Sequence, residues 1–416
     1  MFSVSKDTAP PFEMIAPFFW IGSIFYLLST LFLLTISPQN GHFDLAIVGW
    51  VHWFLLGFIM MIIFGAMAQL IPVVVEVGHF AVDLYYVIWP LLLTGTLLMS
   101  AGFWFYPELL AYGGLIVMIA MIIFLFDTLM TLRKVSNITL TIKIVIASNL
   151  FLLIGIIIGF VMSLAIGSKI EIDIVSWLAT HAVMVLGGYV TLTIMGLSMI
   201  LLPMFGLSHG FDDKPAHRAF YLMVAGVLLN FFSTLIAWKF GKFASYFVMF
   251  ASVSFYIYQI VIIYNTRARK ENDIWVKSMF VGYASFAVAV VLGVIYTLLG
   301  GENILMSAAW FLLIGFFSFL INGHLYKIIP FLVWFQRYSP LVGKEKVPML
   351  HEMLPKRMAE FEFFFSTLGL IFAGLGILFE SDDLFSGGVT LLITGAGFML
   401  ASVRWMLNYG KKEQNV

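Results

Sequence analysis

Residues 52–72, HWFLLGFIMMIIFGAMAQLIP, decide the fold class of this chain. The stretch contains no Asp, Glu, Lys or Arg, and a helix that crosses a bilayer needs about 20 apolar residues. The whole chain of 416 residues has the same character, with 62% hydrophobic residues, 11% charged residues and a mean hydropathy of +1.03. Average soluble proteins carry about 25% charged residues. The sequence therefore predicts an all-α integral membrane protein whose main surroundings are the lipid bilayer.

Apolar runs bounded by charges, Pro or Gly recur along the entire chain. They predict a polytopic bundle of about twelve transmembrane helices that forms a single integral membrane domain over residues 1–416. The expected spans lie near 15–37, 46–74, 85–107, 109–131, 141–166, 176–205, 219–238, 244–265, 278–299, 304–333, 363–379 and 386–408.

The distribution of basic residues predicts the orientation of the bundle. With the N-terminus inside, nineteen of the 22 Lys and Arg residues fall on the cytoplasmic side, and only Lys169, Lys239 and Lys242 fall outside. The positive-inside rule then places both termini in the cytoplasm and the chain in the cytoplasmic (inner) membrane. Acidic residues also number 22, so no basic excess indicates a nucleic-acid partner.

The composition also excludes several kinds of chemistry. The chain has no cysteine, which removes disulfides, thiolate catalysis, Cys-ligated zinc and iron–sulfur clusters. It has no phosphate-binding loop, dinucleotide fingerprint, zinc-protease helix or nucleophile elbow. Whether the chain is an enzyme stays open at this point, and histidine is the main candidate ligand.

The opening stretch belongs to an internal repeat. Its spacing Gly-x7-Gly-x6-Pro occurs in the second, sixth and tenth spans, at Gly57, Gly65 and Pro72, at Gly188, Gly196 and Pro203, and at Gly315, Gly323 and Pro330. At about 100° per residue the three positions share one face of a helix, and the proline ends or kinks it. Such a face permits close helix packing, or it leaves room for flat cofactors. Three copies spaced four spans apart predict pseudo-threefold arcs.

Three histidines could make these helices into a binding site. His52 and His181 each lie about six residues into their spans, about 9 Å below the outer helix ends, and His324 follows Gly323 at the cytoplasmic end. Ionisable residues inside a membrane are costly and are usually functional or paired. Imidazole binds haem and copper, but it can also simply bond to a neighbouring carbonyl or line an aqueous gap. The other cytoplasmic-side histidines, His79, His209, His217 and His351, are expected to be ordinary solvated loop residues.

His52 and His181 occupy different registers within the repeat. His52 precedes its first glycine by five residues and His181 precedes its own by seven, an offset that rotates a side chain by about 200°. The third repeat has Ala308 and Trp310 at the matching positions. We therefore expect the two histidines to address different neighbours.

Residues His52 through Pro72 and Thr180-His181-Ala182 through Pro203, in a chain of twelve spans, resemble the catalytic subunit I of the haem–copper oxidase superfamily, which includes nitric oxide reductases. The chain is also similar to NnrS-type haem and copper membrane proteins, which are linked with nitric oxide tolerance. The resemblance implies a haem b ligand at His52 and a copper ligand at His181. The seventh span has no histidine in its membrane part and the tenth offers Trp310 instead, so the resemblance implies a haem-binding relative without a complete oxygen-reducing centre.

Three functions follow as hypotheses. The first is a haem-binding redox or nitric-oxide-related protein that works with a redox partner or other membrane subunits, with Thr180, Tyr189 and Thr191 orienting its ligands. The second is a twelve-span secondary transporter. Against it, acidic residues are expected near the span ends, with Asp127 the deepest. The third is an assembly subunit that packs partners through its many Phe side chains.

Overall fold

The computed structural model describes residues 10–75 and 77–410 and is helical throughout its length, with 83% of residues in helices. Within these described ranges, twelve helices are long and apolar enough to cross a membrane. This confirms the predicted all-α integral membrane class, because a helix satisfies its own backbone hydrogen bonds in lipid. The expected cytoplasmic ends of the chain, with Lys6, Lys411 and Lys412, lie outside the described residues.

The chain forms two compact units. Unit 1 contains residues 70–271, and unit 2 contains residues 10–69 together with the chain from residue 272. The helix α3, Met61–Val75, carries the chain from unit 2 into unit 1. The expectation of a single membrane domain stays a prediction.

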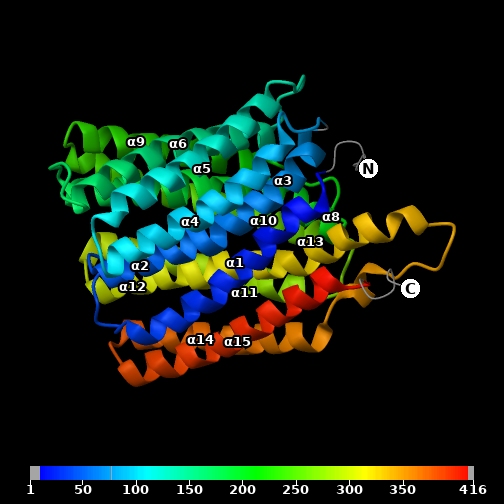
Figure 1. The fold of residues 1–416 in the computed structure, drawn as a ribbon. Helices are drawn as coiled ribbons and strands as arrows, with labels where there is room; N and C mark the ends of the chain where they lie inside the picture. The colour runs from blue at the N-terminus through cyan, green and yellow to red at the C-terminus, as the bar shows by residue number, and fades with distance from the viewer. Residues whose placement is uncertain (1–9, 76, 411–416) are drawn as a thin grey trace. The chain divides into compact units, whose positions relative to one another are not determined.

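Unit 1 is built from helix pairs that are adjacent in sequence. After α3, its elements are η3 Val82–Leu84, α4 Tyr85–Trp104, α5 Leu109–Leu132, α6 Leu140–Ile166, α7 Ile174–Ala182, η4 Val183–Thr191, α8 Leu192–Gly206, α9 Lys214–Leu235 and α10 Lys239–Thr266. The largest helix–helix packings in this unit join α4 with α5, which lie side by side in Figure 1, and α9 with α10. The connections within these two pairs are short, which fixes their antiparallel arrangement.

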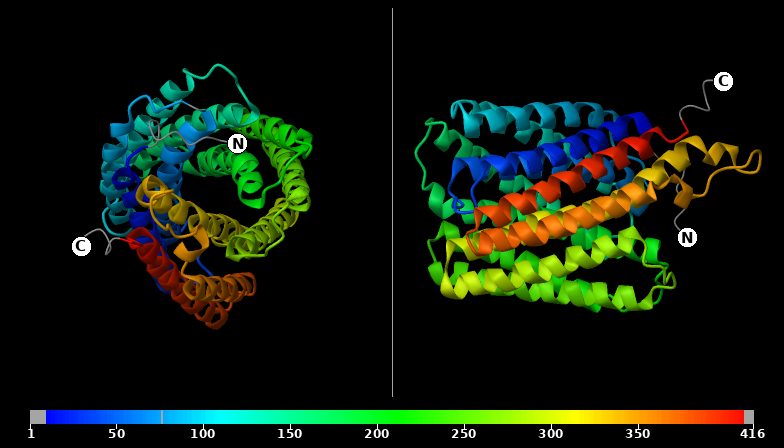
Figure 2. Two further views of the ribbon diagram at one scale, coloured as in Figure 1. Left: turned by 90° about the vertical axis from the view of Figure 1, so that its right-hand side faces the viewer. Right: turned by 90° about the horizontal axis from the view of Figure 1, so that it is seen from below.

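Unit 2 joins the first two spans to the last four. Its elements are α1 Phe12–Phe32, η1 Leu33–Thr35, α2 Leu45–His52, η2 Trp53–Met60, α11 Ile274–Leu299, α12 Glu302–Trp310, η5 Phe311–Ser318, α13 Phe319–Arg337, η6 Ser339–Leu341, η7 Leu350–Met353, α14 Lys356–Leu378 and α15 Asp382–Asn408, with the first part of α3. The hairpin α14–α15 packs closely along its length, and α15 also packs on α1 (Figure 2). Segments from opposite ends of the sequence therefore share one core.

Local capping explains where several helices begin. An oxygen of the residue before the helix accepts a hydrogen bond from the backbone of the first turn in α2, α6, α7, α11 and α15, which start after Asp44, Thr139, Asp173, Asp273 and Ser381. Such caps satisfy backbone N–H groups that have no partner inside the helix. The polar residues that separate the apolar runs thus set the starts of the spans.

The second, sixth and tenth spans are each interrupted by a π-helical segment. These segments are η2, η4 and η5, and the first glycine of the repeat lies in each of them, at Gly57, Gly188 and Gly315. A π-helical turn bonds residue i to i+5 and so contains one more residue than an α-helical turn. Hydropathy carries no signal for this change, and the faces predicted above rest on a uniform α-helical spacing of about 100° per residue.

The prolines of the repeat, which were expected to end or kink their helices, do not end them, because α3 continues to Val75, α8 to Gly206 and α13 to Arg337. One expected helix start is wrong. The eleventh span begins at Lys356, directly after Pro355, and not near residue 363. The charges of its first turns were taken for a loop, and this places Glu362 inside the helix.

Candidate functional site

The glycines of the repeat face a neighbouring helix in all three copies. A Cβ atom on Gly188 would lie 2.8 Å from Cβ of Phe151 on α6, and one on Gly315 would lie 2.5 Å from Cβ of Ser285 on α11. Gly57 meets the ring of Phe25 on α1 in the same way. Side chains thus fill the space beside these glycines, which supports helix packing and not room for a flat cofactor.

His52 is the last residue of α2 and directly precedes η2. Its Nδ1 lies 2.8 Å from the carbonyl oxygen of Val48, one turn earlier. A carbonyl oxygen can only accept, so Nδ1 carries the proton and donates it, and the lone pair of the neutral ring is on Nε2. This is the tautomer that a metal-ligating imidazole uses.

His181 bonds to a different helix. Its Nδ1 lies 2.9 Å from the carbonyl oxygen of Gly155 on α6, which again places the lone pair on Nε2. One turn further along α6, a Cβ on Gly159 would lie only 2.6 Å from Cε1 of His181, so this glycine makes room for the ring. Gly159 lies outside the repeat and was not predicted as a site residue. The Thr180 hydroxyl lies 2.7 Å from the Thr234 hydroxyl.

His324 is the sixth residue of α13 and is buried. Its Nδ1 lies 2.8 Å from the carbonyl oxygen of Leu320, and its ring meets that of Trp275 edge-on with centroids 6.0 Å apart. Nearby, Nζ of Lys327 forms an ion pair with Asp273 at 2.6 Å. The three candidate histidines therefore share one bonding pattern, in which a backbone carbonyl fixes the tautomer.

The structure does not gather these histidines into one metal centre. In the described part of the chain, no three His, Asp or Glu side chains come together in a group that could hold a metal ion. His52 and His324 belong to unit 2, whereas His181 belongs to unit 1. Each candidate ligand therefore has its own separate surroundings.

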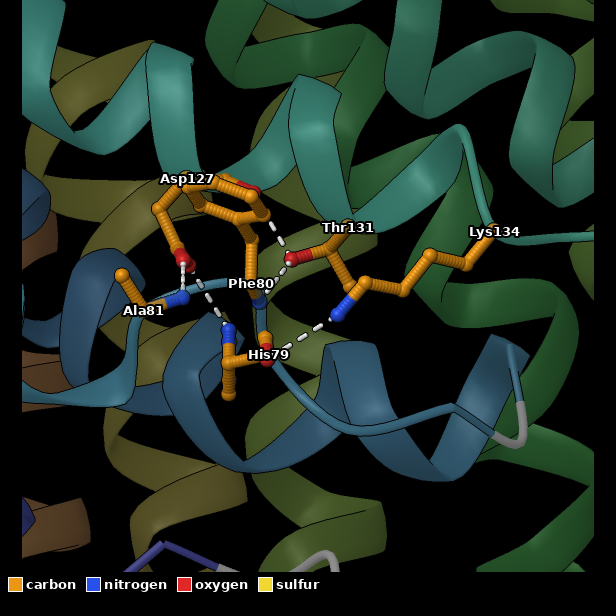
Figure 3. A network of polar contacts seen from close by, with 6 residues as sticks. All are labelled: His79, Phe80, Ala81, Asp127, Thr131 and Lys134. Atoms are coloured by element: carbon orange, nitrogen blue, oxygen red, sulfur yellow. Dashed lines mark hydrogen bonds and ion pairs between the residues drawn. The ribbon is translucent and has the colours of Figure 1, made fainter.

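His79 is not a solvated loop residue, and the expectation that it would be is wrong. Its Nδ1 lies 2.7 Å from Oδ2 of Asp127 on α5, and both side chains are buried (Figure 3). The other carboxylate oxygen, Oδ1, accepts the backbone N–H of Ala81 at 2.8 Å, and the N–H of Phe80 donates to Thr131. Asp127, the acid expected to lie deepest, thus holds residues 79–81, which precede α4, against α5.

A second buried acid lies in unit 2. Glu362 on α14 is 2% exposed, and its Oε1 accepts a hydrogen bond from Nδ2 of Asn322 on α13 at 3.1 Å. Tyr326, one turn further along α13, donates toward Oε2 at 3.5 Å, and Ser366 donates toward Oε1 at 3.4 Å. None of these residues was predicted from the sequence to belong to a site. We call Glu362, Asn322, Tyr326, Ser366 and Tyr26 on α1 the Glu362 cluster.

A signal for the Glu362 cluster exists in the sequence. Asn322 and Tyr326 are polar residues four apart on the tenth span, and Glu362 and Ser366 are four apart on the eleventh. Residues at i and i+4 share one helix face.

Comparison of the chain with models of protein families and with curated proteins gives no match.

Proposed function

We propose that this chain is a haem-binding integral membrane protein with a redox or nitric-oxide-related role, a relative of haem–copper oxidase subunit I without a complete oxygen-reducing centre. The observation that carries the proposal is the shared tautomer of His52, His181 and His324. Each donates from Nδ1 to a backbone carbonyl and thereby presents Nε2 as the ligating nitrogen.

His52 and His181 are the first candidates for axial ligation of a haem b, and His324 is the third. Gly159 adds a cradle for the His181 ring, which a side chain at this position would fill. A bound haem would supply one-electron transfer or the binding of a small gas. The protein contributes the imidazoles, their fixed tautomer and an apolar environment. Copper at His52 or His181 remains the smaller part of the proposal, because no larger ligand group surrounds either residue among those described.

The repeat supports the proposal that the fold consists of pseudo-threefold arcs, as in haem–copper oxidase subunit I. In each copy the glycine helix packs on the span before it, that is η2 on α1, η4 on α6 and η5 on α11. The same pairing at three places is what pseudo-threefold arcs of four spans require. We place the chain in the cytoplasmic membrane with both ends in the cytoplasm, where a redox partner or other membrane subunits would meet it.

The absorption spectrum of the detergent-purified protein tests the haem, together with a pyridine haemochrome assay and metal analysis. We expect a Soret band that is lost or shifted in His52→Ala and in His181→Ala. The control is His217→Ala, which removes an exposed histidine whose Nδ1 lies 3.2 Å from the carbonyl oxygen of Asp213. A colourless preparation without haem or copper would reject the proposal, and unchanged spectra in both variants would reject the ligands.

The Glu362 cluster favours a second candidate, a secondary transporter. Acidic residues were expected near the span ends, and Glu362 lies six residues after the start of α14, but it is buried within this candidate membrane-spanning helix. Transporters that are driven by ions use acids in such places. Uptake of a labelled solute into liposomes that an uncoupler abolishes would support this function. If the preparation contains haem and takes up no solute, the result would contradict the transporter and leave haem binding as the remaining proposal.

A further inference from the structure

The Glu362 carboxyl group lies well inside a helix that has the length and apolarity of a membrane span. It is six residues after the start of α14 at Lys356, or about 9 Å along the helix axis. Among the described residues, no Lys, Arg or His side chain forms an ion pair with it. A buried carboxylate without a cationic partner is costly unless hydrogen bonds or a bound cation compensate its charge.

The nearest polar groups suit the ionised form of Glu362. The amide Nδ2 of Asn322 and the hydroxyls of Tyr326 and Ser366 all donate toward the two carboxylate oxygens. Donors from α13 and from α14 itself thus converge on one buried carboxyl group. Three such hydrogen bonds replace part of the hydration that the charge loses on burial.

The same surroundings also suit the protonated form. A protonated carboxyl group needs one acceptor for its O–H. The Oδ1 atom of Asn322 and the hydroxyl of Tyr26 are buried, and neither lies within hydrogen-bonding geometry of another group among the described residues. The Tyr26 hydroxyl lies beside Ser318, Asn322 and Ser366. A flip of the Asn322 amide, or a movement of the Tyr26 hydroxyl, would allow one of these oxygens to accept a hydrogen bond from the protonated Glu362.

We propose that Glu362 is an intramembrane proton-binding site, served by Asn322, Tyr326, Ser366 and Tyr26. The carboxylate takes up one proton from water and releases it again, and no other reactant is required. A proton fits better than a metal cation, because the groups aimed at the carboxylate are donors, whereas a hard cation needs several oxygen lone pairs. This inference rests on the Glu362 cluster alone and requires neither haem nor solute transport.

Infrared difference spectroscopy of the full chain in liposomes tests the proposal. The pH would be stepped from about 4 to about 10, a range that covers ordinary and strongly raised carboxyl pKa values. We expect a carbonyl band of a buried, protonated carboxyl group that disappears as the pH rises. The band should be absent in Glu362→Gln, which keeps the shape of the side chain but has no carboxyl group to titrate.

The matched control is Glu360→Gln, because Glu360 is an exposed acid two residues earlier on the same helix. The band should survive in this variant. In Glu362→Asp, which retains a carboxyl group, the band should remain at a shifted position, and size-exclusion elution would show that each variant is folded. A band present in folded Glu362→Gln, or no titrating band in the unaltered protein, would overturn the proposal. A midpoint that moves when Na⁺ replaces choline would overturn it in favour of a cation site.

Discussion

At the scale of single residues, the repeat glycines are defined by what lies against them. Gly188 and its neighbour Gly187 illustrate the difference within one π-helical segment. A Cβ on Gly188 would lie 2.8 Å from Cβ of Phe151, which is the stem of a side chain and cannot swing away. A Cβ on Gly187 would have its nearest neighbours at 3.9 Å, which is ordinary van der Waals contact. The two positions therefore differ in packing while sharing almost the same backbone.

Gly188→Ala is expected to destabilise the protein by about 1–3 kcal/mol, because the added methyl group overpacks the contact with α6. The matched variant Gly187→Ala should stay within about 0.5 kcal/mol of the unaltered protein. Thermal unfolding of the detergent-solubilised protein measures both. Equal losses in the two variants would show that the contact with Phe151 does not set the requirement for glycine.

Gly159→Ala should move the His181 ring, since the new methyl group would lie 2.6 Å from Cε1 of the imidazole. If His181 ligates a haem, the Soret band of this variant shifts while the haem content falls or stays the same. Gly397→Ala serves as the control, because a Cβ there meets no atom within 4 Å. An identical Soret band in the unaltered protein, Gly159→Ala and Gly397→Ala would show that His181 does not ligate a haem.

Residue types were predicted more easily than their partners. The three candidate histidines could be named from the sequence, because charged or ionisable residues are rare in apolar runs. Their shared bond from Nδ1 to a carbonyl could not be predicted, since it depends on side-chain rotamers and, for His181, on a second helix. Glu362 was missed for another reason, namely that the first turns of α14 are charged and look like a loop.

At the scale of elements, the π-helical segments explain the spacing of the repeat. The glycines are eight residues apart, whereas the residues that they meet on the neighbouring helix are seven apart, as Phe151 and Ile144 are on α6. Two turns of helix against helix correspond to about seven residues. The additional residue on the glycine side is the one that a π-helical turn absorbs. The eight-residue spacing can be read from the sequence, but its cause, the π-helical turn, is evident only in the structure.

The segment before α4 provides a prediction at the same scale. Asp127→Ala removes the acceptor for His79 and for the backbone N–H of Ala81, and each group left buried without a partner costs about 1–3 kcal/mol. We expect faster hydrogen–deuterium exchange in residues 77–81 and a lower thermal unfolding midpoint. Asp83→Ala removes an exposed acid close by and should change neither quantity. Unchanged exchange in Asp127→Ala would mean that other contacts hold this segment.

At the scale of the whole molecule, the number and type of the spans followed from hydropathy alone. Twelve apolar helices were predicted and twelve are present in the described chain, with ends that differ by up to seven residues. Charges near the ends caused the largest error, at α14, because hydropathy treats every charge as a boundary. The division into two compact units had no sequence signal, because it depends on packing between helices that are distant in the chain.

The orientation of the bundle is open to a direct test, because the chain has no cysteine of its own. Lys346→Cys lies in the exposed loop after α13, and Lys169→Cys lies in the exposed loop after α6. A membrane-impermeant maleimide applied to intact cells should label the variant at position 169 and spare the variant at position 346. Inverted membrane vesicles should give the reverse pattern. The opposite result in both preparations would invert the positive-inside assignment.

The spacing of the repeat by four spans has a consequence for how such a chain can grow. Four is an even number, so a segment that carries one glycine helix enters and leaves the bilayer on the same side. A tandem copy of its coding sequence would therefore insert in the same direction as the parent, without any exchange of basic residues between its loops. Repeats with an odd number of spans must instead insert upside down, as in many transporters. Duplication of such a segment would extend this architecture by four helices, and its deletion would shorten it by four, while the direction of every remaining loop is preserved.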